Sequence, residues 1–357
     1  MNQEEILELL KLVAPGTVLR DGLDNILRAK TGALIVVSDD KEVMNITDGG
    51  FKLDLDFTPA SIYELSKMDG AIVLSKDIKK ILMANVQLVP DHTIKTIETG
   101  TRHRTAERVA KQTNELVICI SQRRGIITIF KGDFRYVLND LSIVVTRANQ
   151  TLETLEKYKA VFDNMLNILS EHEFDDIVSL ETVANCIYRS ETIMRMEAEV
   201  KRCIVELGTE GRLINMQLEE IISNVESEEK KIIQDYMVVK KRSTKNEETI
   251  LNDIRKLDKK DLLISEKIIR LLGYEITPNI LDYNVSPKGY RILSKVPKMP
   301  AYVIDKTIEE FGSLQGVCAA SVEELDEVEG IGEIRARILN QSLRRLQEQY
   351  LLKGYNI

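Results

Sequence analysis

The sequence predicts a multidomain protein, an α/β domain followed by all-α segments, and three observations indicate it. Up to residue 145, short runs rich in Val and Ile alternate with helical patterns and with turns marked by Gly, Pro and Asp. No Gly or Pro occurs from Asp133 to Leu207, which favours long helices. After Pro297 and Pro300 the pattern resets into short helices. We therefore expect an α/β domain with a central mixed sheet flanked by helices (1–145), a long helical-bundle spine (146–290) and a small helical domain (291–357).

Composition and charge narrow the class of protein. The chain of 357 residues is long enough for two or three cores, and 43% hydrophobic with 30% charged residues is typical of globular proteins. Apolar runs such as Ala33–Val37 reach only strand length, so we expect no membrane span. The N-terminus carries acids where a secretory signal carries Lys or Arg, so we expect a cytoplasmic protein. A net charge of −8 means that any DNA contact must be local.

Five short runs are predicted as strands of the first domain because they are apolar, β-branched and bounded by turn residues. They are Ala33–Val37, Ala71–Leu74, Leu116–Ile120, Ile126–Phe130 and Phe134–Leu138. Between the first two, Thr58-Pro59 supplies an N-cap followed by proline at the first helical position. The helix that follows is expected to run through Ile62, Leu65 and Met68, and it delivers the chain to Asp69.

In the helical segment, apolar residues recur at steps of three and four, which predicts the buried faces of a bundle rather than a ligand site. One such stripe comprises Leu152, Leu155, Phe162, Met165, Leu166 and Leu169, and another comprises Leu213, Met216, Ile221 and Val225. Two charged runs, Glu226–Lys231 and Lys240–Lys245, are interpreted as solvated helix ends or a loop.

The first constellation with chemical meaning combines a carboxylate with a basic helix start. Asp69 stands where a helix ends and a buried strand begins, and Thr101–Thr105 (TRHRT) opens a helix. A helix N-terminus presents free backbone N–H groups and a positive dipole end, to which this run adds two Arg, one His and two Thr hydroxyls. Taken alone, an Asp-Gly turn and a solvated basic turn are open alternatives. Together the two features suit nucleotidyl transfer, which needs a metal ion and cationic donors for a triphosphate.

Neither a P-loop GxxxxGK[ST] nor a GxGxxG motif occurs, so a P-loop NTPase and a dinucleotide-binding fold are not supported. The sequence instead resembles a known family, the DNA integrity scanning diadenylate cyclases called DisA. The resemblance spans nearly the full chain and rests on YELSKMDGAIVLS (Tyr63–Ser75), ANVQLVPD (Ala84–Asp91), ETGTRHRTAERVAKQT (Glu98–Thr113), TLEKYK (Thr154–Lys159), ELGTEGRL (Glu206–Leu213) and DEVEGIGEIRAR (Asp326–Arg337).

This resemblance implies roles for individual residues of the first domain. Asp69 would bind a divalent metal, Mg²⁺ or Mn²⁺, and help to activate the ribose 3′-hydroxyl of ATP. The nucleotide would lie against Gly70 and Ala71, with Leu88 near the adenine. His92 is not part of the family motif and is interpreted as an exposed loop residue. The phosphates would be held by Thr101, Arg102, His103, Arg104 and Thr105, with Ser121 and Arg124 as weaker candidates.

The resemblance also implies an assembly. Because each such domain holds one ATP, two domains must face each other so that each 3′-hydroxyl attacks the α-phosphate of the other nucleotide. Members of the family form homo-octamers through their N-terminal domains, with the helical segments as spines. We expect the same arrangement here.

A second constellation lies near the C-terminus, where Val328–Gly332 (VEGIG) precedes a helix that carries Arg335 and Arg337. An apolar residue followed by Gly-x-Gly before a helix is the helix-hairpin-helix pattern, in which backbone N–H groups reach a DNA phosphate because Cβ atoms are missing. A tight interhelical turn without a ligand is the open alternative. Residues 334–353 hold five bases and one acid, so this stretch is expected to face DNA. The predicted DNA-binding residues are Gly330, Ile331, Gly332, Arg335 and Arg337.

The sequence therefore predicts a nucleotidyltransferase that condenses two ATP into cyclic di-AMP and two pyrophosphates. DNA, above all branched or junction DNA, would be sensed by the C-terminal domain and would inhibit synthesis. The alternative is a nucleotide-gated DNA-binding and repair scaffold that senses ATP without turning it over. A purely structural oligomerisation hub is disfavoured, because a scaffold has no use for Asp69 beside a basic helix start.

Overall fold

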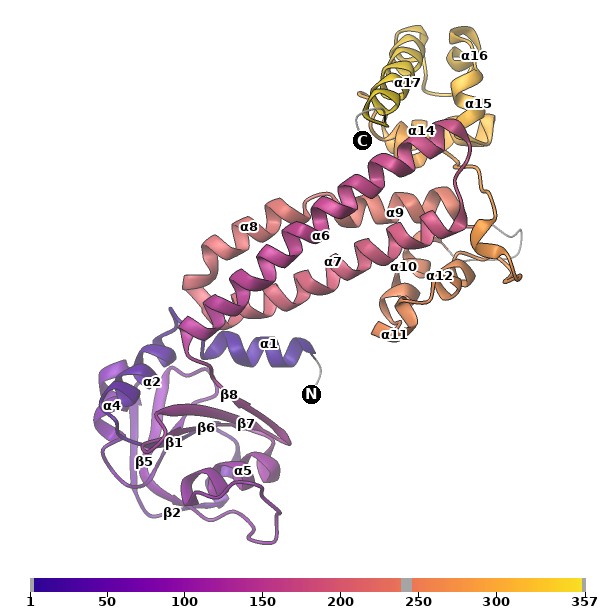
Figure 1. Ribbon diagram of the computed structural model, residues 1–357. Coiled ribbons are helices and arrows are strands. Elements are labelled where there is room, and N and C mark those ends of the chain that lie inside the picture. Colours follow the sequence, from indigo (N-terminus) through magenta and orange to yellow (C-terminus); the bar gives the residue numbers. More distant parts are fainter. Residues whose placement is uncertain (1–2, 239–245, 355–357) are drawn as a thin grey trace. The chain divides into compact units, whose positions relative to one another are not determined.

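The computed structural model describes residues 3–238 and 246–354, which divide into two compact units (Figure 1). The first unit comprises Met1–Asn149 together with Lys201–Asn215, and the second comprises Gln150–Val200 together with Met216–Ile357. The charged run Lys240–Lys245 lies outside the described residues.

A mixed sheet of eight strands forms the centre of the first unit. Its order is β2-β5-β4-β1-β6-β7-β8, with β3 pairing β5 on the side. Strands β1 and β4 run parallel and the other pairs are antiparallel. The strand bounds are β1 (Ala33–Val37), β2 (Thr47–Asp48), β3 (Phe51–Asp56), β4 (Ala71–Leu74), β5 (Lys80–Leu88), β6 (Leu116–Ser121), β7 (Ile126–Lys131) and β8 (Phe134–Val137).

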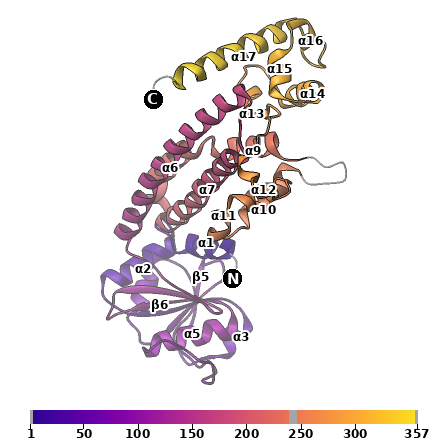
Figure 2. The ribbon, with the colours of Figure 1, turned by 45° about the vertical axis from the view of Figure 1, so that its right-hand side comes forward.

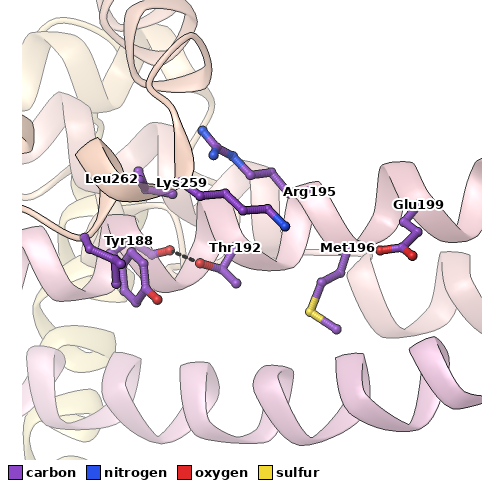
Figure 3. Close-up of a pocket in the computed structure, with 8 residues that line it drawn as sticks. Tyr188, Thr192, Arg195, Met196, Glu199, Lys259 and Leu262 are labelled. Carbon is purple, nitrogen blue, oxygen red and sulfur yellow. Dashed lines mark hydrogen bonds between the residues drawn. The ribbon is translucent and has the colours of Figure 1, made fainter. Parts of the chain in front are cut away.

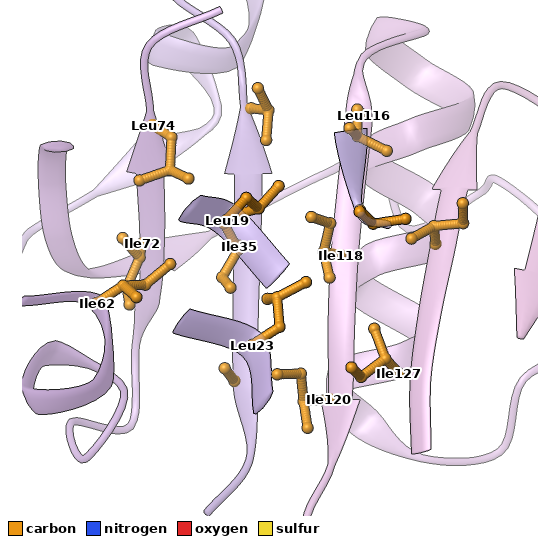
Figure 4. Close-up of a cluster of buried hydrophobic side chains, with 14 of the residues drawn as sticks. Leu19, Leu23, Ile35, Ile62, Ile72, Leu74, Leu116, Ile118, Ile120 and Ile127 are labelled. Carbon is orange, nitrogen blue, oxygen red and sulfur yellow. The ribbon is translucent and has the colours of Figure 1, made fainter. Parts of the chain in front are cut away.

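Helices cover both faces of this sheet (Figure 2), because its strands β1, β4 and β6 are apolar on both sides. One face packs against α1 (Gln3–Leu12), α2 (Val18–Arg28) and α4 (Pro59–Leu65), and Figure 4 shows Leu19 and Leu23 of α2 lying over Ile35. The other face packs against α3 (Lys41–Asn45) and α5 (Thr101–Thr113). The α/β class and the mixed sheet expected for this part of the chain are confirmed.

All five predicted strands are present, with ends that differ by at most one residue. The pattern of apolar runs in the sequence did not predict β2, β3 or β5. Strand β3 is mostly exposed and alternates with Lys and Asp, so it lacks an apolar run. Strand β5 is interrupted by an irregularity, described below. Thr58 caps α4 as expected, its side chain accepting from the Ser61 N–H, but α4 ends at Leu65, short of Met68.

Long helices follow the sheet, as the absence of Gly and Pro predicted. Helices α6 (Leu141–Asp175) and α7 (Leu180–Leu207) precede a series of shorter ones. The first predicted stripe is buried except for Met165, which is partly exposed, and Leu155, Phe162 and Leu169 are each 0% exposed. The second was wrong at its start, because Leu213 is 69% and Met216 56% exposed. The shorter helices are α8 (Arg212–Ile222), α9 (Val225–Tyr236), α10 (Glu247–Arg255), α11 (Lys259–Leu262), α12 (Ser265–Leu271) and α13 (Tyr290–Leu293).

Charged side chains lie deep inside the second unit. Arg291 and Glu173 form a fully buried ion pair, which the Tyr236 hydroxyl joins by donating to Glu173 at 2.9 Å. Asp235 accepts three backbone N–H bonds at the start of α13. The run Glu226–Lys231 forms the first turns of α9, which agrees with the interpretation as a helix end. It is not solvated throughout, because Glu229 is 0% exposed.

The C-terminal part of the second unit consists of α14 (Ala301–Phe311), α15 (Leu314–Ala319), α16 (Val322–Asp326) and α17 (Glu333–Gly354). Its apolar side chains form a separate core that includes Val303, Leu314, Leu325 and Leu339. Ser321 and Glu324 form a capping box at the start of α16. None of the helices within residues 3–238 and 246–354 has the length and apolar character needed to cross a membrane.

Candidate active site

Most of the predicted site residues of the first domain lie at one end of the central strands. The parallel strands β1 and β4 both begin at this end, and β6, which is antiparallel to β1, ends there. Helix α5 begins beside them. A pocket of about 430 Å³, a volume within the usual range for small-molecule sites, opens here. Its lining consists of Leu34, Asp69, Gly70, Ala71, Asn85, Val86, Gln87, Leu88, Thr101, Arg102 and Thr105.

Asp69 projects from this lining into solvent. Its side chain is fully exposed, and its Oδ1 lies 3.7 Å from Nη2 of Arg102 on α5. Arg102 passes over Gly32, where an added Cβ would lie 2.0 Å from its Nη1. A side chain at that position would displace the guanidinium, so Gly32 leaves room for Arg102 next to the carboxylate.

The start of α5 contributes Thr101, Arg102 and Thr105 to the pocket lining. The N-cap residue of α5 is Gly100, which has no side chain that could cap the first N–H groups of the helix. The loop before it is fixed from both sides. Arg135 donates to Glu98 at 2.5 Å, and the Ile97 N–H donates to Glu107 of α5 at 3.1 Å. These two bonds fix the loop that leads into α5, whose first residues line the pocket.

The side chains of the run Thr101–Thr105 at the start of α5 point in different directions. Thr101, Arg102 and Thr105 line the pocket, whereas His103 and Arg104 do not. His103 turns inward, with Nδ1 3.4 Å from the Cys119 sulfur, and burial lowers its pKa below the usual value. The Arg104 side chain is exposed.

Ser121 and Arg124 form the turn after β6, where the Ser121 hydroxyl accepts from the Arg124 N–H at 3.2 Å. Neither belongs to the pocket lining, although the charge of Arg124 contributes to the lowered pKa of His103. His92 is exposed on a loop, as interpreted, and its carbonyl accepts from Arg108 at 2.9 Å.

Asn85, Val86 and Gln87 were missed as site residues, although the motif ANVQLVPD contains them. One signal was available in the sequence. Asn is depleted in strands, so an Asn inside a β-branched and apolar run marks an irregular backbone. That signal points to Asn85.

The donor set fits a magnesium-type ion completed by substrate. Asp69 is the one acidic residue of the pocket lining, and no cluster of three or more His, Cys, Asp or Glu side chains suited to a metal occurs in the described part of the chain. Mg²⁺ keeps several waters and is typically bound through one or two carboxylates plus phosphates of a nucleotide. A single exposed carboxylate beside Arg102 and the N-terminus of α5 fits this mode of binding.

In the C-terminal helices, the turn Val328–Gly332 joins α16 to α17. Ile331 is buried, and its N–H donates to the Val328 carbonyl at 2.9 Å. Gly330 has φ +88°, and an added Cβ would lie 3.0 Å from the Tyr302 ring. An added Cβ on Gly332 would meet nothing within 4 Å. The internal packing of the protein therefore requires a glycine at 330 and leaves 332 unexplained.

The two predicted arginines after this turn are engaged on the surface of the helix. Arg335 donates to the Gly330 carbonyl at 2.5 Å, and Arg337 pairs with Glu333 at the same distance. Exposed pairs of this kind contribute little to stability, so they do not fix the arginines against an anionic ligand.

A second pocket, of about 300 Å³, lies between α7 and α11 in the second unit (Figure 3). Thr192 donates to the Tyr188 carbonyl, and Arg195 is anchored to Glu191 and to the Leu257 carbonyl. None of the predicted site residues lines this pocket.

Comparison with known proteins gives consistent matches over the chain. The family model described as DisA bacterial checkpoint controller nucleotide-binding matches residues 20–134, and the DisA bacterial checkpoint controller linker region matches residues 138–281. A DNA integrity scanning protein DisA from Carboxydothermus hydrogenoformans is 54% identical over 349 residues, which cover 98% of this chain and 99% of the relative. The protein of the same name from Acetivibrio thermocellus is 51% identical, with 98% and 96% covered.

Among solved structures, a double mutant of DacA from Staphylococcus aureus is similar at a TM-score of 0.31 and 19% identity, covering 40% of this chain and 93% of that one. This likeness is too distant to add to the argument.

Proposed function

The chain belongs to the DisA family, and on that premise we propose that it condenses two ATP molecules into cyclic di-AMP and two pyrophosphates. The observation that carries the proposal is the exposed Asp69 carboxylate beside the start of α5, in a pocket of a size that suits one nucleotide. At the level of the family, the nucleotide-binding match indicates a nucleotidyltransferase of the diadenylate cyclase type.

Different residues of the pocket would bind different parts of ATP. Leu88 and Leu34 offer an apolar wall for the adenine, and Gly70 and Ala71 allow the nucleotide to approach the backbone. Thr101, Arg102 and Thr105 bind the phosphates, because a guanidinium holds phosphate oxygens in bidentate fashion and meets the charge that develops as pyrophosphate leaves. The same assignment for His103, Arg104, Ser121 and Arg124 stays a prediction, since their side chains lie outside this lining.

Asp69 would hold the divalent cation, Mg²⁺ or Mn²⁺, together with phosphate oxygens of ATP. The ion supplies charge neutralisation and acidifies the ribose 3′-hydroxyl. The 3′-hydroxyl would lose its proton to water, its oxygen would form a bond to the α-phosphorus of the other nucleotide, and the bond from that phosphorus to pyrophosphate would break. Repeating the step on the second nucleotide closes the ring.

Each pocket accommodates one nucleotide, so the reaction requires two copies of the first unit with their pockets face to face. We propose that this pairing occurs within a homo-octamer assembled through the N-terminal domains. Native mass spectrometry tests it: eight copies are expected, and a monomer at catalytic concentrations contradicts it.

The C-terminal helices are proposed to form a helix-hairpin-helix domain whose Gly330–Gly332 turn binds the phosphates of branched DNA. Support comes from Gly332, where no internal contact explains the missing side chain, and from the basic stretch on α17. DNA bound there would inhibit synthesis, because a small displacement of two facing nucleotides slows their reaction steeply. Comparing cyclic di-AMP production with a four-way junction and with linear duplex tests the inhibition.

The decisive experiment replaces Asp69 with Asn. Purified protein is incubated with ATP and Mg²⁺ or Mn²⁺, and cyclic di-AMP is quantified by chromatography. We expect wild type to form the product and Asp69→Asn to lose it with its unfolding temperature unchanged, because the amide keeps the shape but cannot neutralise a metal. Wild-type protein that binds ATP and DNA without turnover would instead identify a nucleotide-gated scaffold.

A further inference from the structure

Strand β5 contains an irregularity beside the catalytic pocket. Its pairing with β4 shifts register, so that Ala71 faces Val86 while Val73 faces Met83. Asn85 lies inside this shift with φ +53°, in the left-handed region that most residues avoid. Asn is among the few non-glycine residues that adopt this conformation at low cost. Asn85 therefore suits the left-handed backbone conformation at this irregularity.

Asn85 contacts the residue that follows Asp69 in two ways. Its Oδ1 accepts the Gly70 N–H at 3.1 Å, a bond that joins residues 15 positions apart. Its backbone also lies so close that a Cβ on Gly70 would be 2.3 Å from the Asn85 carbonyl carbon. The bulge thus fixes the Gly70 peptide by a hydrogen bond and by close packing together.

Asp69 has few other restraints. Its side chain is fully exposed, and the guanidinium of Arg102 lies 3.7 Å from it, farther than a hydrogen bond. The direction in which the carboxylate leaves the backbone is therefore set mainly by the peptide that joins it to Gly70. That peptide is held by Asn85.

We propose that Asn85 is a positioning residue for the cyclase reaction, which orients Asp69 by holding the Gly70 N–H. This inference rests on the proposed function. The bond sets where the carboxylate stands relative to the ribose 3′-hydroxyl, and it contributes little to how tightly ATP is held. Loss of the bond should therefore reduce kcat more than it changes KM.

Substitutions at Asn85 separate the bond from the backbone conformation. Gly keeps the left-handed backbone and removes the acceptor. Asp keeps both the acceptor and the conformation, but it adds a negative charge to the lining of a pocket that takes a triphosphate. Asn114, the left-handed residue at the end of α5 with φ +55°, lies outside the pocket and allows the same Asn-to-Gly change as a control.

The experiment measures kcat and KM for ATP with Mg²⁺ in the full-length protein. Asn85→Gly is expected to lower kcat at least about tenfold with KM within about threefold, since misplacement of a reacting group by about 1 Å costs on the order of 100-fold. Asn85→Asp is expected to keep kcat within about threefold and to raise KM several-fold through charge repulsion. Asn114→Gly is expected to match wild type in both.

Hydrogen exchange at the Gly70 amide gives a readout that does not need turnover. Protection should fall in Asn85→Gly and persist in Asn85→Asp. The inference is overturned if Asn85→Gly keeps wild-type kcat, if Asn85→Asp loses kcat as severely as Asn85→Gly, or if Gly70 protection is the same in all three proteins. A wild-type protein without cyclase activity overturns the proposed function itself, whereas the outcomes above leave that function standing and remove only Asn85 from it.

Discussion

Two glycines in the molecule, Gly70 beside Asp69 and Gly332 at the start of α17, are both proposed to face phosphates or nucleotide, and their surroundings differ. A Cβ on Gly70 would lie 2.3 Å from the backbone of Asn85, whereas a Cβ on Gly332 would meet nothing within 4 Å. The first glycine is required by the fold as well as by any ligand. The second meets no packing constraint, and its carbonyl accepts the Ala336 N–H as the N-cap of α17.

This difference shows how the two kinds of site are built. The pocket of the first unit is shaped by tight contacts between strands β4 and β5, so its geometry exists before a nucleotide arrives. In the turn before α17, Gly332 is exposed, and an added Cβ there would meet nothing within 4 Å. Replacing these glycines with Ala should therefore distinguish effects on the stability of the fold from effects on the binding of nucleotide or DNA.

The largest effect is expected for Gly70→Ala. The added methyl group has backbone on its far side and cannot be accommodated by rotating a side chain. We expect unfolding to become easier by about 1–3 kcal/mol, as for overpacked cores, and cyclase activity to fall about 100-fold or more. Thermal unfolding and product formation measure the two. Asp69→Asn is the matched control, and a Gly70→Ala protein with wild-type stability contradicts the close approach.

Gly330→Ala should destabilise the C-terminal helices. A residue with φ +88° is strained when it carries a Cβ, and the Tyr302 ring stands 3.0 Å from that atom. The expected loss is about 1–2 kcal/mol. It is measured by denaturant unfolding monitored through hydrogen exchange of α14–α17. An unchanged exchange pattern would mean that the turn relaxes without cost.

Gly332→Ala should weaken DNA binding and change stability only slightly. Its Cβ meets open space, so the loss of stability should be limited to that of a poorer N-cap for α17. Losing one charge-assisted hydrogen bond to phosphate corresponds to about a tenfold drop in affinity. Fluorescence anisotropy with a labelled four-way junction measures it. A wild-type affinity of this variant for the junction would contradict a role of the turn in DNA binding.

The comparison extends to carboxylates, since Asp69 is fully exposed while Glu229 of α9 is fully buried. Burial raises the pKa of Glu229 from 4.5 to about 8, with the charge of Glu191 adding to the shift, and both of its carboxylate oxygens lack a hydrogen-bond partner. The folded state thus favours the protonated form. Its contribution to stability is present below pH 4.5 and is lost as the pH rises through about 8.

Glu229→Gln keeps the neutral shape at every pH. Relative to wild type, the variant should therefore gain on the order of 1 kcal/mol between pH 6 and pH 9. Unfolding temperatures across this range test the sign. A constant difference between the two proteins would show that Glu229 does not change protonation there.

The sequence by itself determined the local elements. Strand runs such as Ala33–Val37 and the Thr58-Pro59 helix start were predicted, because each depends on neighbours within a few residues. The motifs also indicated the family, and with it the residues Asp69, Arg102 and Gly332 as candidates. Their assigned roles await the experiments above.

Only the tertiary structure decided which side of each element is covered. His103 turns toward Cys119 rather than the pocket, Leu213 is exposed although its spacing matches a buried stripe, and Glu229 is buried although it stands in a charged run. Periodicity states that a helix has faces but not what packs against them. The contact of Asn85 with Gly70 joins two strands through a local shift of register, and no pattern of neighbouring residues encodes such a pairing, because it depends on how separate strands meet.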